Sequence, residues 1–267
     1  NFVYLHVDTQ FTKVTTGAPV TDVANTWLGS WGDYDVDGYP DLFVARFNTG
    51  RNGLYHNNGD GTFTSITTTP FVQTADAWIS GAWADLDNDG RPDLVATRGY
   101  AKPAIVYFNN SDGTFSQIQL LEDSPNNIVV IDYNNDGLLD LLLYGNVSLV
   151  SANPSSLYRN NGDRTFTGMT SKEVGTIVGF AGSGAGACAD YDADGSVDAF
   201  CSNAAGASRL VHNDGTGRFV VVTNLFQGAG CAGATRRLHV HRQSAALRCV
   251  HVHCDAWSRQ YAEDMVR

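Results

Sequence analysis

The chain alternates short apolar runs with polar turns, and this pattern recurs along most of its length. The runs are about four to eight residues long, the length typical of buried strands. Alternating runs at 63–66 and 115–120 follow a second turn and indicate two further strands in each period. No stretch shows sustained helical periodicity, so the pattern predicts an all-β chain with four strands per repeat. The clearest pairs of apolar runs are 26–31 with 42–47, 78–84 with 94–97, and 128–131 with 141–144.

A ten-residue motif, the hairpin phrase, recurs once in each repeat. Its first copy reads Leu-Tyr-His-Asn-Asn-Gly-Asp-Gly-Thr-Phe, and the four copies close on Phe63, Phe115, Phe166 and Phe219. Asn, Asp and Gly between two apolar runs are typical of a β-hairpin turn. A period of about 50 residues with four short strands indicates a β-propeller or another repeat architecture.

A second phrase, Asp-x-(Asp/Asn)-x-Asp-Gly-x-x-Asp, lies between the first two predicted strands of each repeat. Its copies are the first loop (33–41), the second loop (85–93), the third loop (132–140) and the fourth loop (190–198). Oxygen ligands at alternate positions followed by a glycine suit a hard cation such as calcium. Without a cation, the clustered carboxylates would repel one another. The third loop has Asn134 in place of an aspartate, so we expect it to be the weakest site.

The charge of the chain is explained by these loops. The formal net charge is -11, and the loops hold 15 of the 28 acidic residues. The acidity is therefore concentrated at four points, which favours bound cations over a general acidic face for a basic partner.

The acidic loops and the Leu-Tyr-x-Asn-Asn-Gly-Asp-Gly-Thr-Phe hairpins together resemble the FG-GAP or VCBS repeat family, found in the integrin α-subunit propeller. The resemblance covers roughly residues 1 to 227 and implies a calcium-binding β-propeller used outside the cell, here a partial one of about four and a half repeats. It implies main-chain carbonyl ligands from loop position 7, namely Tyr39, Arg91, Leu138 and Ser196. It implies side-chain ligands from positions 1, 3, 5 and 9: Asp33, Asp35, Asp37, Asp41, Asp85, Asp87, Asp89, Asp93, Asp132, Asn134, Asp136, Asp140, Asp190, Asp192, Asp194 and Asp198.

Two other interpretations of the loops are an EF-hand and metal-free surface turns. An EF-hand needs a glutamate at position 12, where this chain has Val44, Ala96, Leu143 and Cys201. The other interpretation is acidic surface turns without metal, since Asp and Gly are common turn residues. Four copies in register favour about four structural calcium ions.

The ends of the chain depart from the repeat. We interpret 1–24 as the outer hairpin of a preceding blade, 25–227 as four repeats, and 228–267 as an atypical basic tail outside the fold. Three explanations of the tail are out-of-frame translation, a basic capping segment and a zinc site. We expect disorder or an isolated helix there. The candidate zinc ligands are Cys249, His251, His253 and Cys254, whose spacing matches no established structural pattern.

Two cysteines flank the fourth loop. Cys188 and Cys201 occupy corresponding positions on the first two predicted strands of that repeat. We expect a cross-strand disulfide, which suits an oxidising compartment. The alternative is a pair of buried thiols acting as small hydrophobes.

The expected function is a non-catalytic extracellular binding or adhesion module that recognises a protein or glycan. One alternative is a lectin whose tryptophans Trp27, Trp31, Trp78 and Trp83 stack on sugars, although at least half of them are expected in the core. Another is a non-catalytic part of a larger secreted enzyme. The chain has no nucleophile elbow, no basic–aromatic stripe for nucleic acid and no apolar run of 18 residues to span a membrane.

Overall fold

The structure is a computed structural model. It describes residues 3–7, 9–21, 25–47, 51–99, 102–123, 125–145, 155–178, 186–201, 208–222, 235–240 and 250–255. The predicted all-β class is confirmed, because these residues form four four-stranded sheets and two two-stranded sheets.

Each four-stranded sheet is an antiparallel meander of consecutive strands. Five of the six predicted apolar runs lie wholly in strands, and the sixth, 42–47, extends one residue past its strand. Each acidic loop joins the first two strands of its sheet. The first sheet contains β3 (Thr26–Gly32), β4 (Asp41–Arg46), β5 (Gly53–Asn57) and β6 (Phe63–Ile66), and the second contains β7 (Trp78–Ala84), β8 (Asp93–Arg98), β9 (Pro103–Asn109) and β10 (Phe115–Asp123). The third contains β11 (Asn127–Ile131), β12 (Asp140–Tyr144), β13 (Ser156–Asn160) and β14 (Phe166–Gly168), and the fourth contains β15 (Gly186–Ala189), β16 (Asp198–Cys201), β17 (Arg209–Asn213) and β18 (Phe219–Val221).

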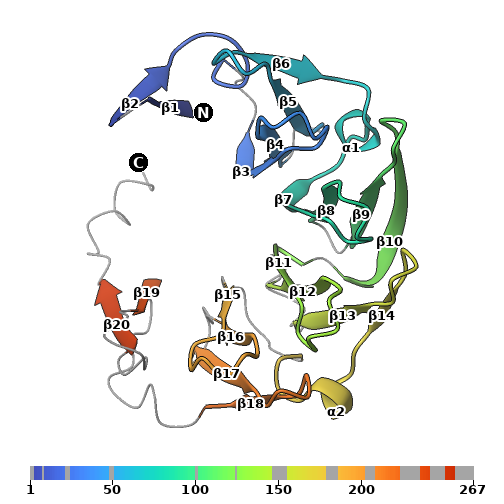
Figure 1. Cartoon of the computed structure of the whole chain (residues 1–267), viewed down its shortest axis with the longest axis vertical. Coiled ribbons are helices and arrows are strands. Elements are labelled where there is room, and N and C mark those ends of the chain that lie inside the picture. Colours follow the sequence, from blue (N-terminus) through green and yellow to red (C-terminus); the bar gives the residue numbers. More distant parts are fainter. Residues whose placement is uncertain are drawn as a thin grey trace, which may run out of the picture.

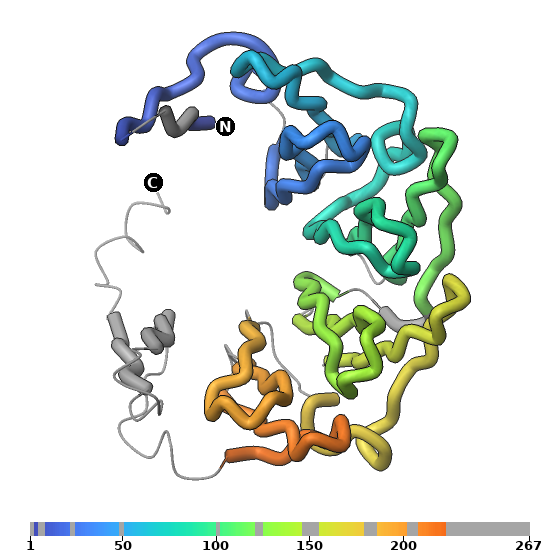
Figure 2. The backbone as a smooth tube through the Cα atoms, viewed as in Figure 1, coloured from blue at the N-terminus to red at the C-terminus, as the bar shows by residue number. Residues whose placement is uncertain are grey.

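The four sheets stand side by side in an arc (Figure 1). The first strand of each sheet lies innermost and the last lies outermost, as the chain trace also shows (Figure 2). Two single-turn helices, α1 (Pro70–Gln73) and α2 (Ser171–Val174), follow β6 and β14. None of the helices in the described part of the chain is long and apolar enough to cross a membrane.

The hydrophobic core lies between neighbouring sheets. In β8, Leu94 packs in the cluster shared with the first sheet, whereas the next residue, Val95, packs in the cluster shared with the third. The second strands are buried on both faces, which explains their continuous apolar runs. The sheets also approach closely, since a Cβ atom on Gly32 would lie 2.5 Å from Cγ of Trp83.

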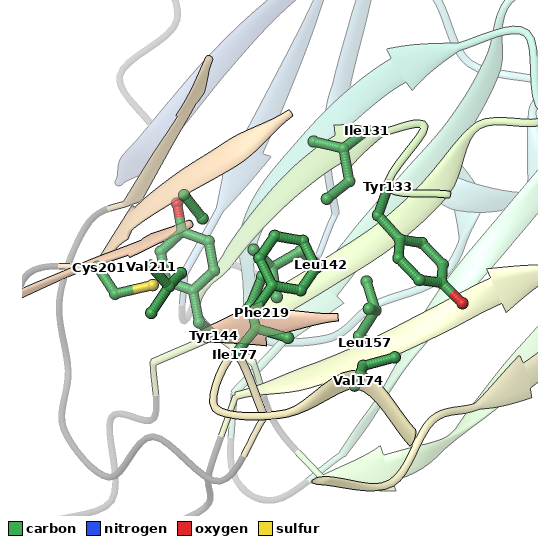
Figure 3. Packing of buried hydrophobic residues seen from close by; sticks show 11 residues of the cluster. Ile131, Tyr133, Leu142, Tyr144, Leu157, Val174, Ile177, Cys201, Val211 and Phe219 are labelled. Carbon is green, nitrogen blue, oxygen red and sulfur yellow. The ribbon is translucent and has the colours of Figure 1, made fainter. Parts of the chain in front are cut away.

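The junction of the third and fourth sheets shows the same packing (Figure 3). Ile131, Leu142 and Leu157 of the third sheet meet Val211 and Phe219 of the fourth in one buried cluster. Helix α2 adds its own apolar side chain to this cluster, so the connection between the two sheets is part of the core.

The predicted disulfide is wrong, because both cysteines are free thiols in the structure. Cys188 pairs with Ala199 and Cys201 pairs with Gly186, so the two cysteines are diagonal neighbours two positions out of register. Diagonal neighbours in a sheet are about 7–8 Å apart, with their Cβ atoms somewhat closer, whereas a disulfide needs Cβ atoms about 4 Å apart. Both thiols pack in the cluster between the third and fourth sheets, as the alternative interpretation had it.

Two further strand pairs lie towards the ends. β1 (Val3–Val7) pairs with β2 (Gln10–Val14), so a hairpin is present where one was predicted. β19 (Thr235–Val240) pairs with β20 (Val250–Asp255). Our expectation of disorder or an isolated helix was wrong for these residues, because they form two paired antiparallel strands. The side chains of the proposed zinc ligands lie outside the described residues.

Candidate metal centres

The last aspartate of each loop is also the first residue of the second strand. Asp41 pairs with Gly32, and Asp93 pairs with Ala84. The third and fourth loops close in the same register. Position 9 of each loop is therefore anchored in the sheet, while positions 1 to 8 form the turn at its end.

Each loop needs two residues in the left-handed backbone conformation. The glycine at position 6 supplies one, as in Gly38 with φ of 93°. The other lies at position 4, where Asn88 and Asn135 tolerate the conformation better than Val36 and the corresponding alanine do. Backbone strain of this kind persists where the surrounding structure maintains it, and it is concentrated at functional sites.

The carboxylate of the aspartate at position 1 accepts hydrogen bonds from main-chain amides of its own loop. In the first loop, Oδ1 of Asp33 accepts a hydrogen bond from the amide of Asp37 at 3.0 Å, and Oδ2 accepts one from the amide of Gly38 at 2.9 Å. The equivalent bonds recur in the other three loops. These main-chain amides fix the orientation of the position-1 carboxylate through hydrogen bonds within the loop.

The aspartate at position 9 is buried. Asp41 and Asp93 are both 0% exposed, and both carboxylate oxygens of Asp41 accept main-chain hydrogen bonds, from Tyr34 and from Asn57. Burial raises the pKa of Asp41 from 3.8 to about 6 and those of Asp93 and Asp140 to about 7, while these amide bonds oppose the shift. A nearby divalent cation would offset the cost of keeping such carboxylates ionised.

The loops bring carboxylate oxygens together as the sequence predicted. Oxygens of three aspartates lie within 4.8 Å of one another in the first, second and fourth loops. This spacing and the all-oxygen donor set fit a calcium ion, which binds oxygen ligands at 2.3–2.6 Å. The trios are Asp33, Asp35 and Asp37; Asp85, Asp87 and Asp93; and Asp190, Asp192 and Asp194. The position-7 amides of Tyr39, Arg91, Leu138 and Ser196 donate to the position-5 aspartates, and the ligand role of their carbonyls stays a prediction.

Two histidines that the sequence reasoning did not assign lie over the first and fourth loops. Nδ1 of His56 is 3.1 Å from Oδ2 of Asp35 and 3.2 Å from Oδ1 of Asp41. His212 occupies the corresponding place in the fourth loop, with Nδ1 3.3 Å from Oδ2 of Asp192. The signal was present in the hairpin phrase, where the residue before the first Asn is His56 or His212 in these two repeats and Phe108 or Arg159 in the others.

The third loop is arranged differently. The side-chain amide of Asn134 donates a 2.8 Å hydrogen bond to Oδ2 of Asp136. This donor takes up a position-5 oxygen that would otherwise be available to a cation. Within the described residues, this loop forms no trio of acidic or histidine ligands like those of the other three.

The tryptophans divide between core and surface. Trp78 is 0% exposed, and Trp83 packs against the buried cluster between the first and second sheets. Trp27 and Trp31 are 48% and 51% exposed on β3. Half of the four are thus core residues, in line with the expectation from sequence.

Comparisons with known proteins agree with this description. Residues 33–96 and 85–143 match the FG-GAP-like repeat. Each match begins at an acidic loop and ends in the second strand of the next sheet, so the predicted FG-GAP-like repeats are confirmed over residues 33–143.

One curated protein and one solved structure are similar to most of the chain. The chain is 26% identical over 230 residues to cartilage acidic protein 1 of Homo sapiens, covering 79% of this chain and 34% of that protein. A solved structure, described as the basis of specific recognition of non-reducing terminal N-acetylglucosamine by an Agrocybe aegerita lectin, superposes with a TM-score of 0.63 at 21% identity. That match covers 92% of this chain and 66% of the lectin chain. The chain spans about a third of the curated relative and about two thirds of the solved one.

Proposed function

We propose that this chain of FG-GAP-like repeats is a calcium-stabilised β-propeller module that binds a protein or glycan outside the cell. The observation that carries the calcium proposal is the convergence of carboxylate oxygens in loops whose backbone already holds them in place. About four ions bind, one in each loop, and they serve as structural cofactors rather than catalytic ones.

Calcium at these positions stabilises the sheets and the junctions between them. Each loop begins at the end of one strand and ends at the start of the next, so an ion bound by positions 1 to 9 connects both strands. An ion that binds only the native state raises stability by mass action. In the first loop, the ion also offsets the repulsion between Asp33, Asp35 and Asp37.

The binding role is supported by the two proteins that this chain resembles. One is named as a cartilage acidic protein and the other is described as a lectin that recognises a sugar. A repeat scaffold with a rigid core leaves its connecting loops free to vary and to bind ligands. An extracellular site, where calcium is abundant and no catalytic machinery is needed, suits this use of the fold.

Glycan recognition is the more specific form of the proposal, and the exposed Trp27 and Trp31 are its candidates for stacking on a sugar. The repeat supplies a competing explanation for Trp31. Trp83 holds the equivalent place in the second sheet, two residues before its loop, and packs on the first sheet. Binding to a glycan array, lost in Trp27→Ala but retained in Trp78→Phe, is the result expected of a lectin.

Calorimetric titration with calcium tests the proposal directly. The chain is expected to take up about four ions, and chelation is expected to lower its melting temperature. Asp190→Asn should remove one ion from the titration. Asp214→Asn, which makes the same charge change at an exposed hairpin turn of the same sheet, should remove none. An isotherm without heat of binding at millimolar calcium would refute the calcium proposal.

A further inference from the structure

Arg164 stands where the other hairpins have glycine. The corresponding residues are Gly61, Gly113 and Gly217, with φ between 78° and 87°, and Arg164 shares the left-handed conformation with φ of 64°. Residues other than Gly, Asn and Asp rarely adopt this conformation, because it strains the backbone. The third hairpin maintains this strain, and the position of the side chain indicates why.

The guanidinium of Arg164 reaches the acidic loop of the preceding sheet. Its Nε and Nη2 atoms each lie 2.6 Å from Oδ2 of Asp87, and Nη2 lies 4.0 Å from Oδ2 of Asp89. Asp87 and Asp89 are positions 3 and 5 of the second loop, two of its predicted calcium ligands. The Asp87 side chain is 7% exposed and that of Arg164 is 39% exposed, so the ion pair joins a buried carboxylate to a partly exposed guanidinium.

Other residues of the second sheet hold the guanidinium in place. Nη1 donates a hydrogen bond to Oδ1 of Asn110 at 2.9 Å, and the guanidinium carbon lies 5.2 Å from the ring centroid of Phe108. Phe108 is the counterpart of His56, which lies over the first loop. The second loop therefore has an arginine and an aromatic ring where the first has a histidine.

We propose that Arg164 is a resident cation of the second loop. It partly neutralises the position-3 and position-5 carboxylates, keeps the loop and its junction with the third sheet in place without metal, and lowers the affinity of this loop for calcium. The inference rests on the proposed function, because it distinguishes among calcium sites. It divides the sites into two strong ones, the first and fourth loops, and two weaker ones, the second and third.

The charge of each loop supports this division. The first and fourth loops have four aspartates each, whereas the third loop has three and Asn134. The second loop has four aspartates and the positive charge of Arg164, and Arg91 within the loop lies 3.7 Å from Asp89. Ligand charge helps to set calcium affinity, so one unit of positive charge at this range is expected to weaken binding about tenfold.

The hairpin position of Arg164 lies next to the preceding acidic loop in another repeat as well. A Cβ atom on Gly217, the counterpart in the fourth sheet, would lie 3.3 Å from Cβ of Asn134 in the third loop. This hairpin position therefore faces position 3 of the preceding loop in more than one repeat. A Cβ atom on Gly113 would meet no atom within 4 Å, so an arginine can be introduced at the equivalent position of the second hairpin.

The test compares calcium titrations and melting temperatures of the whole chain. Arg164→Gln is expected to bind calcium about tenfold more tightly at one site and to melt lower than wild type in EDTA. Adding Asp85→Asn to this variant should abolish the gain, which assigns it to the second loop. Gly113→Arg is expected to weaken one of the strong sites.

Arg218→Gln is the matched control, because it removes the same charge from a hairpin arginine whose guanidinium donates to the carbonyl of Lys172 instead. It should leave the isotherm unchanged. If wild type binds calcium but Arg164→Gln leaves the isotherm unchanged and lowers the melting temperature equally with and without calcium, Arg164 is only an inter-sheet ion pair and the inference fails. If wild type takes up no calcium, the proposed function itself fails.

Discussion

The side-chain amide of Asn160 donates a hydrogen bond to the main-chain carbonyl of Leu86, 2.6 Å away in the neighbouring sheet. Asn160 opens the third hairpin turn, and Leu86 is position 2 of the second loop. The same bond joins Asn109 to Tyr34 and Asn213 to Tyr133. The second, third and fourth sheets are therefore each attached to the acidic loop of the sheet before them.

Asn160→Ala is expected to lower the free energy of unfolding by about 1–3 kcal/mol, because it leaves a buried carbonyl without a donor. Asn161→Ala is the matched control, since Asn161 is exposed and its side chain bonds only within its own hairpin. Its effect should stay within about 0.5 kcal/mol. Urea unfolding followed by tryptophan fluorescence measures both, and equal effects would contradict an inter-sheet role for the bond.

Asn134→Asp is expected to tighten calcium binding at the third loop, because it adds a negative ligand and removes the amide donor that holds Asp136. The melting temperature in EDTA should fall, since the new carboxylate adds repulsion. Calorimetric titration and thermal unfolding measure the two effects. A titration in which the wild-type third loop fills before the first would show that ligand charge does not decide the order.

Val36→Asn is expected to stabilise the metal-free chain by about 1 kcal/mol, because a β-branched residue is costly in the left-handed conformation and asparagine is tolerated there. Asn88 and Asn135 at the same loop position also donate hydrogen bonds to the position-6 glycine carbonyl of the next loop. Val36→Ala, which lacks that amide and keeps the strain, should gain less. Thermal unfolding in EDTA distinguishes them, and a destabilised Val36→Asn would contradict the reasoning.

Stability of the metal-free chain is expected to fall as the pH rises from 5 to 8. Burial raises the folded-state pKa of Asp93 and Asp140 to about 7, above the ordinary value of 3.8. Groups with a raised pKa contribute stability that is complete below pH 4 and is lost as the pH passes through about 7. Calcium should reverse this trend, because protons no longer compete for the carboxylates at higher pH. Melting temperatures in EDTA and in excess calcium at each pH provide the measurement, and a metal-free melting temperature that rises across this window would contradict it.

Much of the site was predictable because its signals are local. The loop spacing predicted which aspartates come together, and the strand register then placed Asp41 and Asp93 at the start of second strands. Turn residues predicted the hairpins for the same reason. The cysteine pair was predicted wrongly because equivalent positions in the repeat are diagonal in the sheet, which the spacing of Cys188 and Cys201 around the loop does not reveal.

The order of strands, the position of the four loops and the identity of their carboxylates follow from the sequence by itself, since each depends on residues a few positions apart. Contacts between sheets were decided only by the tertiary structure. Arg164 and Asp87 are 77 residues apart in the chain, and Asn160 and Leu86 are 74 apart. Their pairing depends on how one twisted sheet packs against the next, and this packing arises from many buried side chains rather than from any local pattern.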